Sequence, residues 1–210
     1  MTVLVVIAKE CLPGKVKTRL QPQFTVDQAA QLANASLNDT LAAASVVNAD
    51  RKILYFEGTR VPPAAAGFEL VMQRSGTLDE RLAVIFDAVR DPVFLVGMDT
   101  PQITPALIEA ASARWPEDVD AWFGPARDGG FWALGLGRMR NRGAIVRGVP
   151  MSTNHTGQRQ FERLERAGLR VQLLPELTDI DTAATLLEVA QLIPTSALSV
   201  ALASITSHQN

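Results

Sequence analysis

A loop rich in cations directly follows the first apolar run of the sequence. Residues 3–8 have the pattern of a buried strand, and the chain then passes through Pro13-Gly14 into Lys15, Lys17 and Arg19. Because the three cations alternate, an extended loop would point them the same way, and Arg19 could hold two phosphate oxygens. Ligands of open α/β sheets lie beyond the carboxyl ends of the strands, where glycine lets backbone N–H groups approach an anion. The loop therefore predicts a phosphate site, with a solvated basic turn as the alternative. A Walker-type ATPase is disfavoured because the motif G-x-x-x-x-G-K-[ST] is absent.

Two aspartates are placed either to bind a divalent cation or to cap helices. Asp99 follows the apolar run 93–96, where Mg²⁺ or Mn²⁺ could bridge its carboxylate to a diphosphate, because hard cations prefer oxygen ligands. A capping role for Asp99 is the weaker alternative, since Thr104 can cap the next helix itself. Asp181 lies between an expected strand and an expected helix, so metal binding and capping remain equal alternatives. If the two carboxylates converge, a cation between them would relieve their repulsion.

Two glycine-containing loops could border a ligand. Gly129 and Gly130 follow Asp128 between two expected strands, where the lack of side chains allows close approach, although Asp-Gly-Gly is also a common hairpin turn. Gln73 precedes Gly76 in the loop after the third strand, and its amide could read a base edge. An ordinary turn is the alternative there.

Composition bounds the class of protein. The 210 residues are 47% hydrophobic and 20% charged, which predicts one globular domain. The formal net charge of -2 leaves no excess of cations for a nucleic-acid backbone, so no nucleic-acid partner is expected. With one cysteine, Cys11, no internal disulfide is possible, and one cysteine with two histidines disfavours a zinc site. No signal peptide or 18-residue apolar run is visible, which predicts a cytoplasmic protein without a membrane span.

Strand-like and helix-like segments alternate, which predicts an α/β fold with a mainly parallel sheet and helices on both faces. The expected strands are residues 3–8, 52–56, 68–72, 93–96, 121–123, 131–136 and 170–174. The expected helices are residues 25–44, 78–89, 155–167 and 182–193, with another that opens at Thr104-Pro105. Residues 194–210 form a C-terminal tail that is apolar and then polar, which leaves a short helix, a dimer contact or a frayed end open.

The motifs occur together in an order that resembles a known family. They are AK (8–9), PGKVKTRL (13–20), GTLDERL (76–82), GMDTP (97–101), DGGFW (128–132), GL (135–136), PMST (150–153) and DIDT (179–182). This order is similar to that of the small glycosyltransferase-like proteins of the nucleotide-diphospho-sugar transferase superfamily, many of which are grouped as a domain of unknown function. The chain also resembles 2-phospholactate and molybdenum cofactor guanylyltransferases. The resemblance covers about residues 1–193, and the combination is specific even though each motif alone is not.

The resemblance implies a single GT-A-like, Rossmann-like domain, with a nucleotide over the first half of the sheet and an acceptor over the second. It implies that Mg²⁺ or Mn²⁺ is held by Asp99 and Asp181, and that Lys15, Arg19 and Asp99 have catalytic roles. The implied nucleotide-binding residues are Ala8, Lys9, Gly14, Lys15, Lys17, Thr18, Arg19, Gln73 and Gly76. The implied acceptor or sugar pocket consists of Asp128, Gly129, Gly130, Ser152 and Thr153.

The chain departs from the family pattern at three places. Met151 replaces a usual aromatic residue, Asn154-His155 replaces a small-acidic pattern, and residues 183–185 replace a proline and an acid. These departures bear on the acceptor more than on the nucleotide site.

The expected function is a metal-dependent transferase that moves a glycosyl group from a nucleotide-sugar, or part of a nucleoside triphosphate, to a small acceptor. Nucleotidyl transfer to a small phosphorylated acceptor is the nearest alternative, and a non-catalytic nucleotide sensor is another. The expected partners are the nucleotide or nucleotide-sugar, the small-molecule acceptor, and a second copy of the chain in a homodimer.

Overall fold

The alternation of strands and helices is present in the computed structural model, which describes residues 1–112 and 115–207. Its strands are β1 (Val3–Lys9), β2 (Arg51–Glu57), β3 (Glu69–Met72), β4 (Val93–Val96), β5 (Ala121–Pro125), β6 (Phe131–Leu136) and β7 (Val171–Leu173). Its α-helices are α1 (Val26–Ser45), α2 (Leu78–Ala88), α3 (Pro105–Ser112), α4 (Arg142–Val146), α5 (Thr156–Arg166), α6 (Ala183–Leu192) and α7 (Ala197–Ser207). Two short 3-10 helices, η1 (Thr18–Leu20) and η2 (Pro63–Ala65), complete the elements of the described residues.

The strands form one mixed sheet in the order β3-β2-β1-β4-β6-β5-β7. The pairs β1–β2, β2–β3, β1–β4 and β5–β7 run parallel. Strand β6 runs antiparallel to both of its neighbours, β4 and β5. The predicted α/β class, with a mainly parallel mixed sheet, is therefore confirmed.

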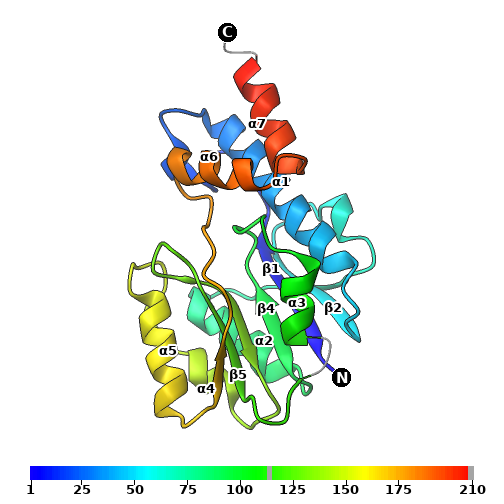
Figure 1. Ribbon diagram of the computed structural model, residues 1–210, viewed down its shortest axis with the longest axis vertical. Coiled ribbons are helices and arrows are strands. Elements are labelled where there is room, and N and C mark those ends of the chain that lie inside the picture. Colours follow the sequence, from blue (N-terminus) through cyan, green and yellow to red (C-terminus); the bar gives the residue numbers. More distant parts are fainter. Residues whose placement is uncertain (113–114, 208–210) are drawn as a thin grey trace.

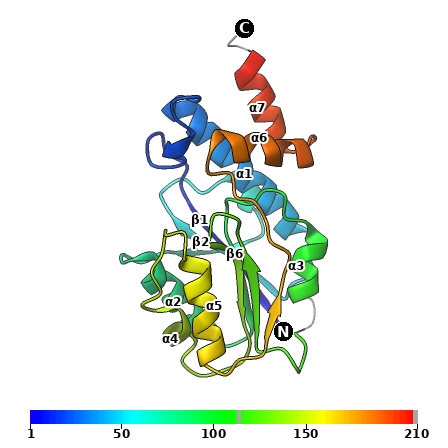
Figure 2. The ribbon, with the colours of Figure 1, turned by 60° about the vertical axis from the view of Figure 1, so that its left-hand side comes forward.

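Helices cover both faces of the sheet because the central strands are apolar on both sides. In β1, Leu4 and Val6 pack with α1 and α3, whereas Val3 and Val5 pack with α2, α4 and α5. This division follows from the two-residue period of a strand, which sends successive side chains to opposite faces. Figures 1 and 2 show the two helical layers on either side of the sheet.

The C-terminal segment forms a helix that packs on the rest of the chain. The carboxylate of Asp39 in α1 accepts the N–H groups of Ala197 and Leu198 at 2.8 and 2.9 Å, which caps the start of α7. Leu20, at the end of the basic loop, belongs to the same apolar cluster as Leu198 and Leu202. Of the three alternatives for the tail, a helix is observed over Ala197–Ser207. Figure 1 shows α6 and α7 beside α1.

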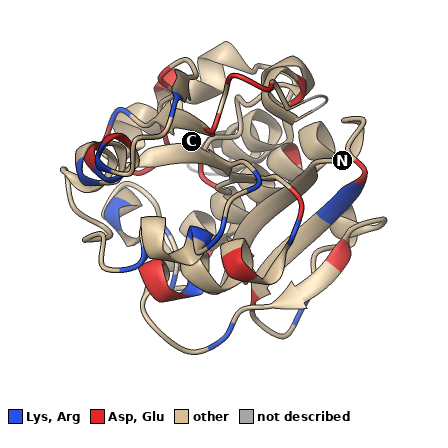
Figure 3. Cartoon of the chain, turned by 90° about the horizontal axis from the view of Figure 1, so that it is seen from below, with Lys and Arg blue, Asp and Glu red and all other residues tan. Residues whose placement is uncertain are grey.

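Positions of positively and negatively charged residues are interspersed along the cartoon in Figure 3, and the formal net charge is -2. No helix in the described part of the chain has the length and apolarity needed to cross a bilayer.

An ion pair at the amino end of β5 makes stability depend on pH. The carboxylate of Asp120 accepts the backbone N–H, Nε and Nη2 of Arg170 at distances of 2.8 to 2.9 Å. Hydrogen bonds from this arginine lower the pKa of Asp120 from 3.8 to about 2. Because the folded-state pKa is the lower one, the pair stabilises the fold above the unfolded-state value of 3.8 and loses that contribution as pH falls toward 2.

We therefore expect Asp120→Asn to lower the free energy of unfolding by about 1 kcal/mol at neutral pH, since the pair is partly solvent-screened. The difference from the native chain should shrink steadily below about pH 4. Urea denaturation at a series of pH values measures this difference, with the substitution Glu165→Gln at an exposed position of α5 as the control. An Asp120→Asn deficit that is constant with pH would contradict the assignment.

Candidate active site

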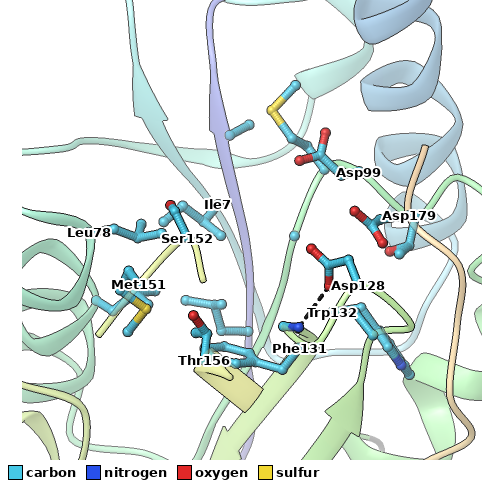
Figure 4. A pocket seen from close by; sticks show the side chains of 18 of the residues that line it. Ile7, Leu78, Asp99, Asp128, Phe131, Trp132, Met151, Ser152, Thr156 and Asp179 are labelled. Atoms are coloured by element: carbon cyan, nitrogen blue, oxygen red, sulfur yellow. Dashed lines mark hydrogen bonds between the residues drawn. The ribbon is translucent and has the colours of Figure 1, made fainter. Parts of the chain in front are cut away.

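A cavity of about 290 Å³ lies at the carboxyl ends of the parallel strands. It is lined by residues from the ends of β1, β2 and β4, the start of β6, and the loops that precede α2, α5 and α6 (Figure 4). Eight of the predicted site residues line it: Ala8, Lys9, Gln73, Asp99, Asp128, Gly130, Ser152 and Thr153. The other predicted residues, Gly14, Lys15, Lys17, Thr18, Arg19, Gly76, Gly129 and Asp181, are outside this lining.

The basic loop is folded rather than extended. Gly14 and Lys17 have positive φ angles of 72° and 47°, and η1 begins at the next residue, Thr18. Val16 and Leu20 are buried and anchor the loop to the body of the protein. The premise that alternation points Lys15, Lys17 and Arg19 the same way is therefore wrong, because an alternating pattern shares a face only in an extended chain.

Two cations of this loop are paired with the two predicted metal ligands. The Nζ atom of Lys17 lies 2.8 Å from Oδ1 of Asp99, and the Lys17 side chain is only 7% exposed. Nη1 of Arg19 lies 2.5 Å from Oδ2 of Asp181. Lys15 is exposed, and its carbonyl accepts the ammonium group of Lys9 at 3.1 Å. The structure thus places Lys17 and Arg19, from one loop, against carboxylates that follow β4 and β7.

Three aspartates face the same part of the cavity, and one of them was missed in the sequence. Figure 4 shows Asp99, Asp128 and Asp179 near one another. Burial, and then the negative charge of Asp128, raise the pKa of Asp179 to about 6. The DIDT motif contains both aspartates on either side of Ile180, which is fully buried, and nothing in the motif itself distinguishes Asp179 from Asp181. Sequence reasoning selected Asp181 from that motif, whereas Asp179 is the one that lines the cavity.

Asp181 does not cap α6. The side chain of Thr182 accepts the N–H of Thr185 at 3.2 Å in a reciprocal capping box, and Asp181 uses its carboxylate for Arg19. The capping alternative for Asp181 is therefore wrong. The expected cap at Thr104 is present, since its hydroxyl accepts the N–H of Leu107 at 3.2 Å, which leaves Asp99 free of that role.

The carboxylates fit a divalent cation that shares its coordination with a substrate. Within residues 1–112 and 115–207, no three His, Cys, Asp or Glu side chains are close enough to form a ready-made metal cage. Mg²⁺, however, is usually held by one or two carboxylates together with substrate phosphates and water. Asp99 and Asp179 supply such oxygen ligands, and a cation would relieve the energetic cost of the partly buried charge on Asp179.

The amide of Gln73 joins the ends of β1 and β2. Its Nε2 donates to the carbonyls of Ala8 and Tyr55, both at 2.9 Å, and its Oε1 accepts Nη1 of Arg81 at 2.8 Å. Both of its amide donor bonds are therefore used within the fold, and base reading by Gln73 stays a prediction. Gly76 lies beside Glu80, which completes the capping box of α2 with Thr77.

The glycine turn and the loop before α5 support each other. The N–H of Gly157 donates to the carbonyl of Gly129 at 2.7 Å, and the N–H of Gly130 donates to Oδ1 of Asp128 at 2.7 Å. This arrangement fixes the Asp128 carboxylate at the cavity. Ser152 and Thr153, in the loop opposite, are exposed and line the cavity as well.

Comparison with solved structures shows the class of fold, which is the GT-A-like fold of nucleotide-diphospho-sugar transferases. A structure from Desulfovibrio desulfuricans G20, provisionally named a nucleotide-diphospho-sugar transferase, has a TM-score of 0.83 and 24% identity, over 98% of this chain and 95% of that one. A nucleotidyl transferase from Methanothermobacter thermautotroptrophicus has a TM-score of 0.58 and 15% identity, over 93% and 99% of the two chains. Glucosyl-3-phosphoglycerate synthase from Mycobacterium tuberculosis, solved with Mn²⁺, UDP and glucosyl-3-phosphoglycerate, has a TM-score of 0.53 and 12% identity, over 85% and 70%.

The chain belongs to the family described as "Uncharacterized protein conserved in bacteria (DUF2064)", whose model matches residues 20–153. The resemblance inferred from the motifs is thereby confirmed for the family and for the fold. No curated protein matches the sequence.

Proposed function

We propose that the chain is a metal-dependent transferase that binds a nucleotide-sugar and transfers its glycosyl group to a small acceptor. The observation that carries the proposal is that Asp99, Asp128 and Asp179 line one cavity, while Lys17 is paired with Asp99 and Arg19 with Asp181. Such a combination of carboxylates and cations matches the needs of a metal-bound diphosphate. The likeness to a structure named as a nucleotide-diphospho-sugar transferase supports the same class.

The residues divide into three roles. Lys15, Lys17 and Arg19 hold the phosphates of the donor and balance the charge on the departing diphosphate. Asp99 and Asp179 would hold Mg²⁺ or Mn²⁺, while Asp181 positions Arg19 through their ion pair. When bound, the metal acts as a Lewis acid that neutralises phosphate charge.

The acceptor performs the substitution with its own oxygen. Asp128, which keeps one carboxylate oxygen on the N–H of Gly130, accepts the proton of the acceptor hydroxyl with the other. The acceptor oxygen bonds to the sugar carbon, the bond from that carbon to the phosphate oxygen breaks, and the nucleoside diphosphate leaves with the electron pair. No residue of the chain needs to form a covalent intermediate.

Nucleotidyl transfer is the second candidate, because a nucleotidyl transferase shares the fold over 99% of its own length. The same cations would then hold a triphosphate, and pyrophosphate would leave in place of a nucleoside diphosphate. The two reactions differ in their products.

Product analysis tests both reactions and the sensor alternative. The chain is incubated with Mn²⁺, an acceptor library and either nucleotide-sugars or nucleoside triphosphates, and the products are identified by mass spectrometry. A released nucleoside diphosphate with a glycosylated acceptor supports the proposal, whereas pyrophosphate with a nucleotidylated acceptor supports the second candidate. Tight nucleotide binding without any product would support the alternative of a non-catalytic nucleotide sensor.

Exchange of Lys17 tests the division of roles. The ammonium group of Lys17 forms an ion pair with the Asp99 carboxylate at 2.8 Å. Lys17→Met should therefore free this carboxylate and tighten the binding of Mn²⁺ alone by about 3- to 10-fold. The affinity for nucleotide should fall by about 10-fold, because a cation that contacts the phosphates is lost. Electron paramagnetic resonance of free Mn²⁺ and calorimetry with nucleotides measure the two effects. The control is Lys52→Met. The ammonium group of Lys52 in the native chain contacts the Ser45 carbonyl, far from the site. Parallel loss of both affinities would contradict the role of Lys17 as a competitor of the metal.

A further inference from the structure

Two hydrogen bonds join the segment that carries Asp179 to the loop that carries Asp99, and Figure 4 shows the two carboxylates near each other. The N–H of Ile180 donates to the carbonyl of Asp99 at 3.0 Å. On the other side of Asp179, Nε2 of Gln102 donates to the carbonyl of Thr178 at 2.5 Å. The residues immediately before and after Asp179 are therefore both bonded to the loop after β4, which fixes the backbone of this aspartate relative to Asp99.

The backbone of Gln102 is itself held by a tight turn. The N–H of Ile103 donates to the carbonyl of Thr100 at 3.1 Å, which closes a turn over Pro101 and Gln102. Thr100 and Ile103, at the two ends of the turn, are only 2% and 4% exposed. The side chain of Gln102 thus extends from a fixed base. Gln102 is not among the described residues that line the cavity, so its amide acts on the site through Thr178.

The site needs such a contact because its carboxylates repel one another. Asp99, Asp128 and Asp179 line one cavity, and like charges in one site favour moving apart. The amide of Gln102 is uncharged and bonds to the backbone, so it holds the Asp179 segment without occupying the carboxylate. Ligands that are already in place bind a metal ion more tightly than ligands that must be gathered.

Of the two hydrogen bonds between the segments, the bond from Gln102 is the one that a side chain forms. The bond between Ile180 and Asp99 joins two backbone groups, and a side-chain substitution does not remove either group. The identity of residue 102 therefore determines whether Asp179 is held from both sides.

We propose that Gln102 is a positioning residue of the metal site, whose amide holds the Asp179 segment where the carboxylates of Asp99 and Asp179 can bind one divalent cation. The inference rests on the proposed function, because it takes these two aspartates as the metal ligands. It adds to that function a residue that contacts neither the metal nor the substrate.

The substitution Gln102→Met tests this role, because it keeps the approximate size of the side chain and removes the donor. Oε1 of Gln102 is buried and has no hydrogen-bond partner among the described residues. Methionine also removes the cost of burying this oxygen, so the stability of the chain should change little. The binding of Mn²⁺ in the presence of UDP, GDP, CDP or ADP should weaken by about 10-fold or more. Binding of the same nucleotides in EDTA should stay unchanged, since the basic loop is intact. Calorimetry measures both affinities.

The matched control is Gln160→Met. Nε2 of Gln160 in α5 donates to the carbonyl of Ile145 at 3.1 Å, and its Oε1 is likewise buried without a partner among the described residues. This substitution removes the same kind of bond outside the two ligand segments, so Mn²⁺ binding should not change. A second variant, Gln102→Asn, suits a turn and keeps the amide, but it is one methylene group shorter. It should weaken Mn²⁺ binding by about 3-fold or more, and it decides the question if Gln102→Met does not fold.

Native Mn²⁺ affinity in the folded Gln102 variants would overturn the inference, as would an equal loss of affinity in Gln160→Met. Either result leaves the proposed function standing, because the native chain still binds Mn²⁺ with a nucleotide. If the native chain binds Mn²⁺ with none of the four nucleotides, the proposed function fails and the inference fails with it. If Mn²⁺ binding depends on Gln102 but no transfer product forms with any donor, the positioning role is supported and the transferase proposal is wrong.

Discussion

Asp99→Asn is expected to weaken the binding of Mn²⁺ with nucleotide by roughly 30- to 150-fold, which corresponds to about 2–3 kcal/mol for one charged ligand contact. The carboxylate of Asp99 lies at the cavity, follows the buried strand β4, and is paired with Lys17 at 2.8 Å. The amide keeps the shape of the side chain and removes its charge, so the fold should be retained. Transfer should fall at least as far as the affinity for the metal–nucleotide complex.

The comparison with other aspartates makes this test specific. Asp179→Asn should weaken metal binding by a similar factor if Asp179 is the second ligand, whereas Asp181→Asn should reduce only nucleotide affinity, because it releases Arg19. The exposed residue Asp118, before β5, gives the control Asp118→Asn. Calorimetry with Mn²⁺ and a nucleotide measures all four chains. If Asp181→Asn loses metal binding and Asp179→Asn keeps it, the ligand pair is the one first predicted from the sequence.

The parts of the fold that could be predicted depend on local patterns. Apolar runs identified the buried strands, and the helix expected from residue 25 is present as α1, where Thr25 is the N-cap and forms a capping box with Gln28. The rule that ligands lie at the carboxyl ends of parallel strands selected Asp99, and the family resemblance added Lys9 and Ser152. All three residues line one cavity.

The parts that could not be predicted depend on contacts between distant segments. The folded basic loop buries Leu20 in a cluster with residues of α1, α6 and α7, and the sequence of the loop alone does not indicate these distant partners. The choice between Asp179 and Asp181 depends on the position of Arg19, which is distant in the sequence and pairs with Asp181, while Asp179 lines the cavity. Both outcomes arise from tertiary packing, which overrides the pattern of a short segment.

The two neighbouring glycines of the β5–β6 turn are expected to respond very differently to the same substitution. Gly129 has a φ of 88°, and a Cβ at this position would collide with the backbone of Asn154. Gly129→Ala therefore combines an unfavourable backbone conformation with separation of the turn from α5, and should lower the free energy of unfolding by about 2–4 kcal/mol. At Gly130 the three atoms nearest to an added Cβ all belong to the carboxylate of Asp128, the closest at 3.0 Å.

Gly130→Ala should consequently keep most of the stability, displace Asp128 and reduce transfer by about 10-fold or more, while nucleotide and metal affinities stay near those of the native chain. Thermal unfolding and calorimetry on the two variants separate the effects. The family resemblance assigned both glycines to the acceptor pocket, with a hairpin turn as the alternative, whereas the geometry gives Gly129 a structural role and places Gly130 at the cavity. A stable Gly129→Ala chain would contradict the close contact with Asn154. Normal transfer by Gly130→Ala would show that Asp128 takes no part in the reaction, because the carboxylate of Asp128 is the group that the new methyl must displace.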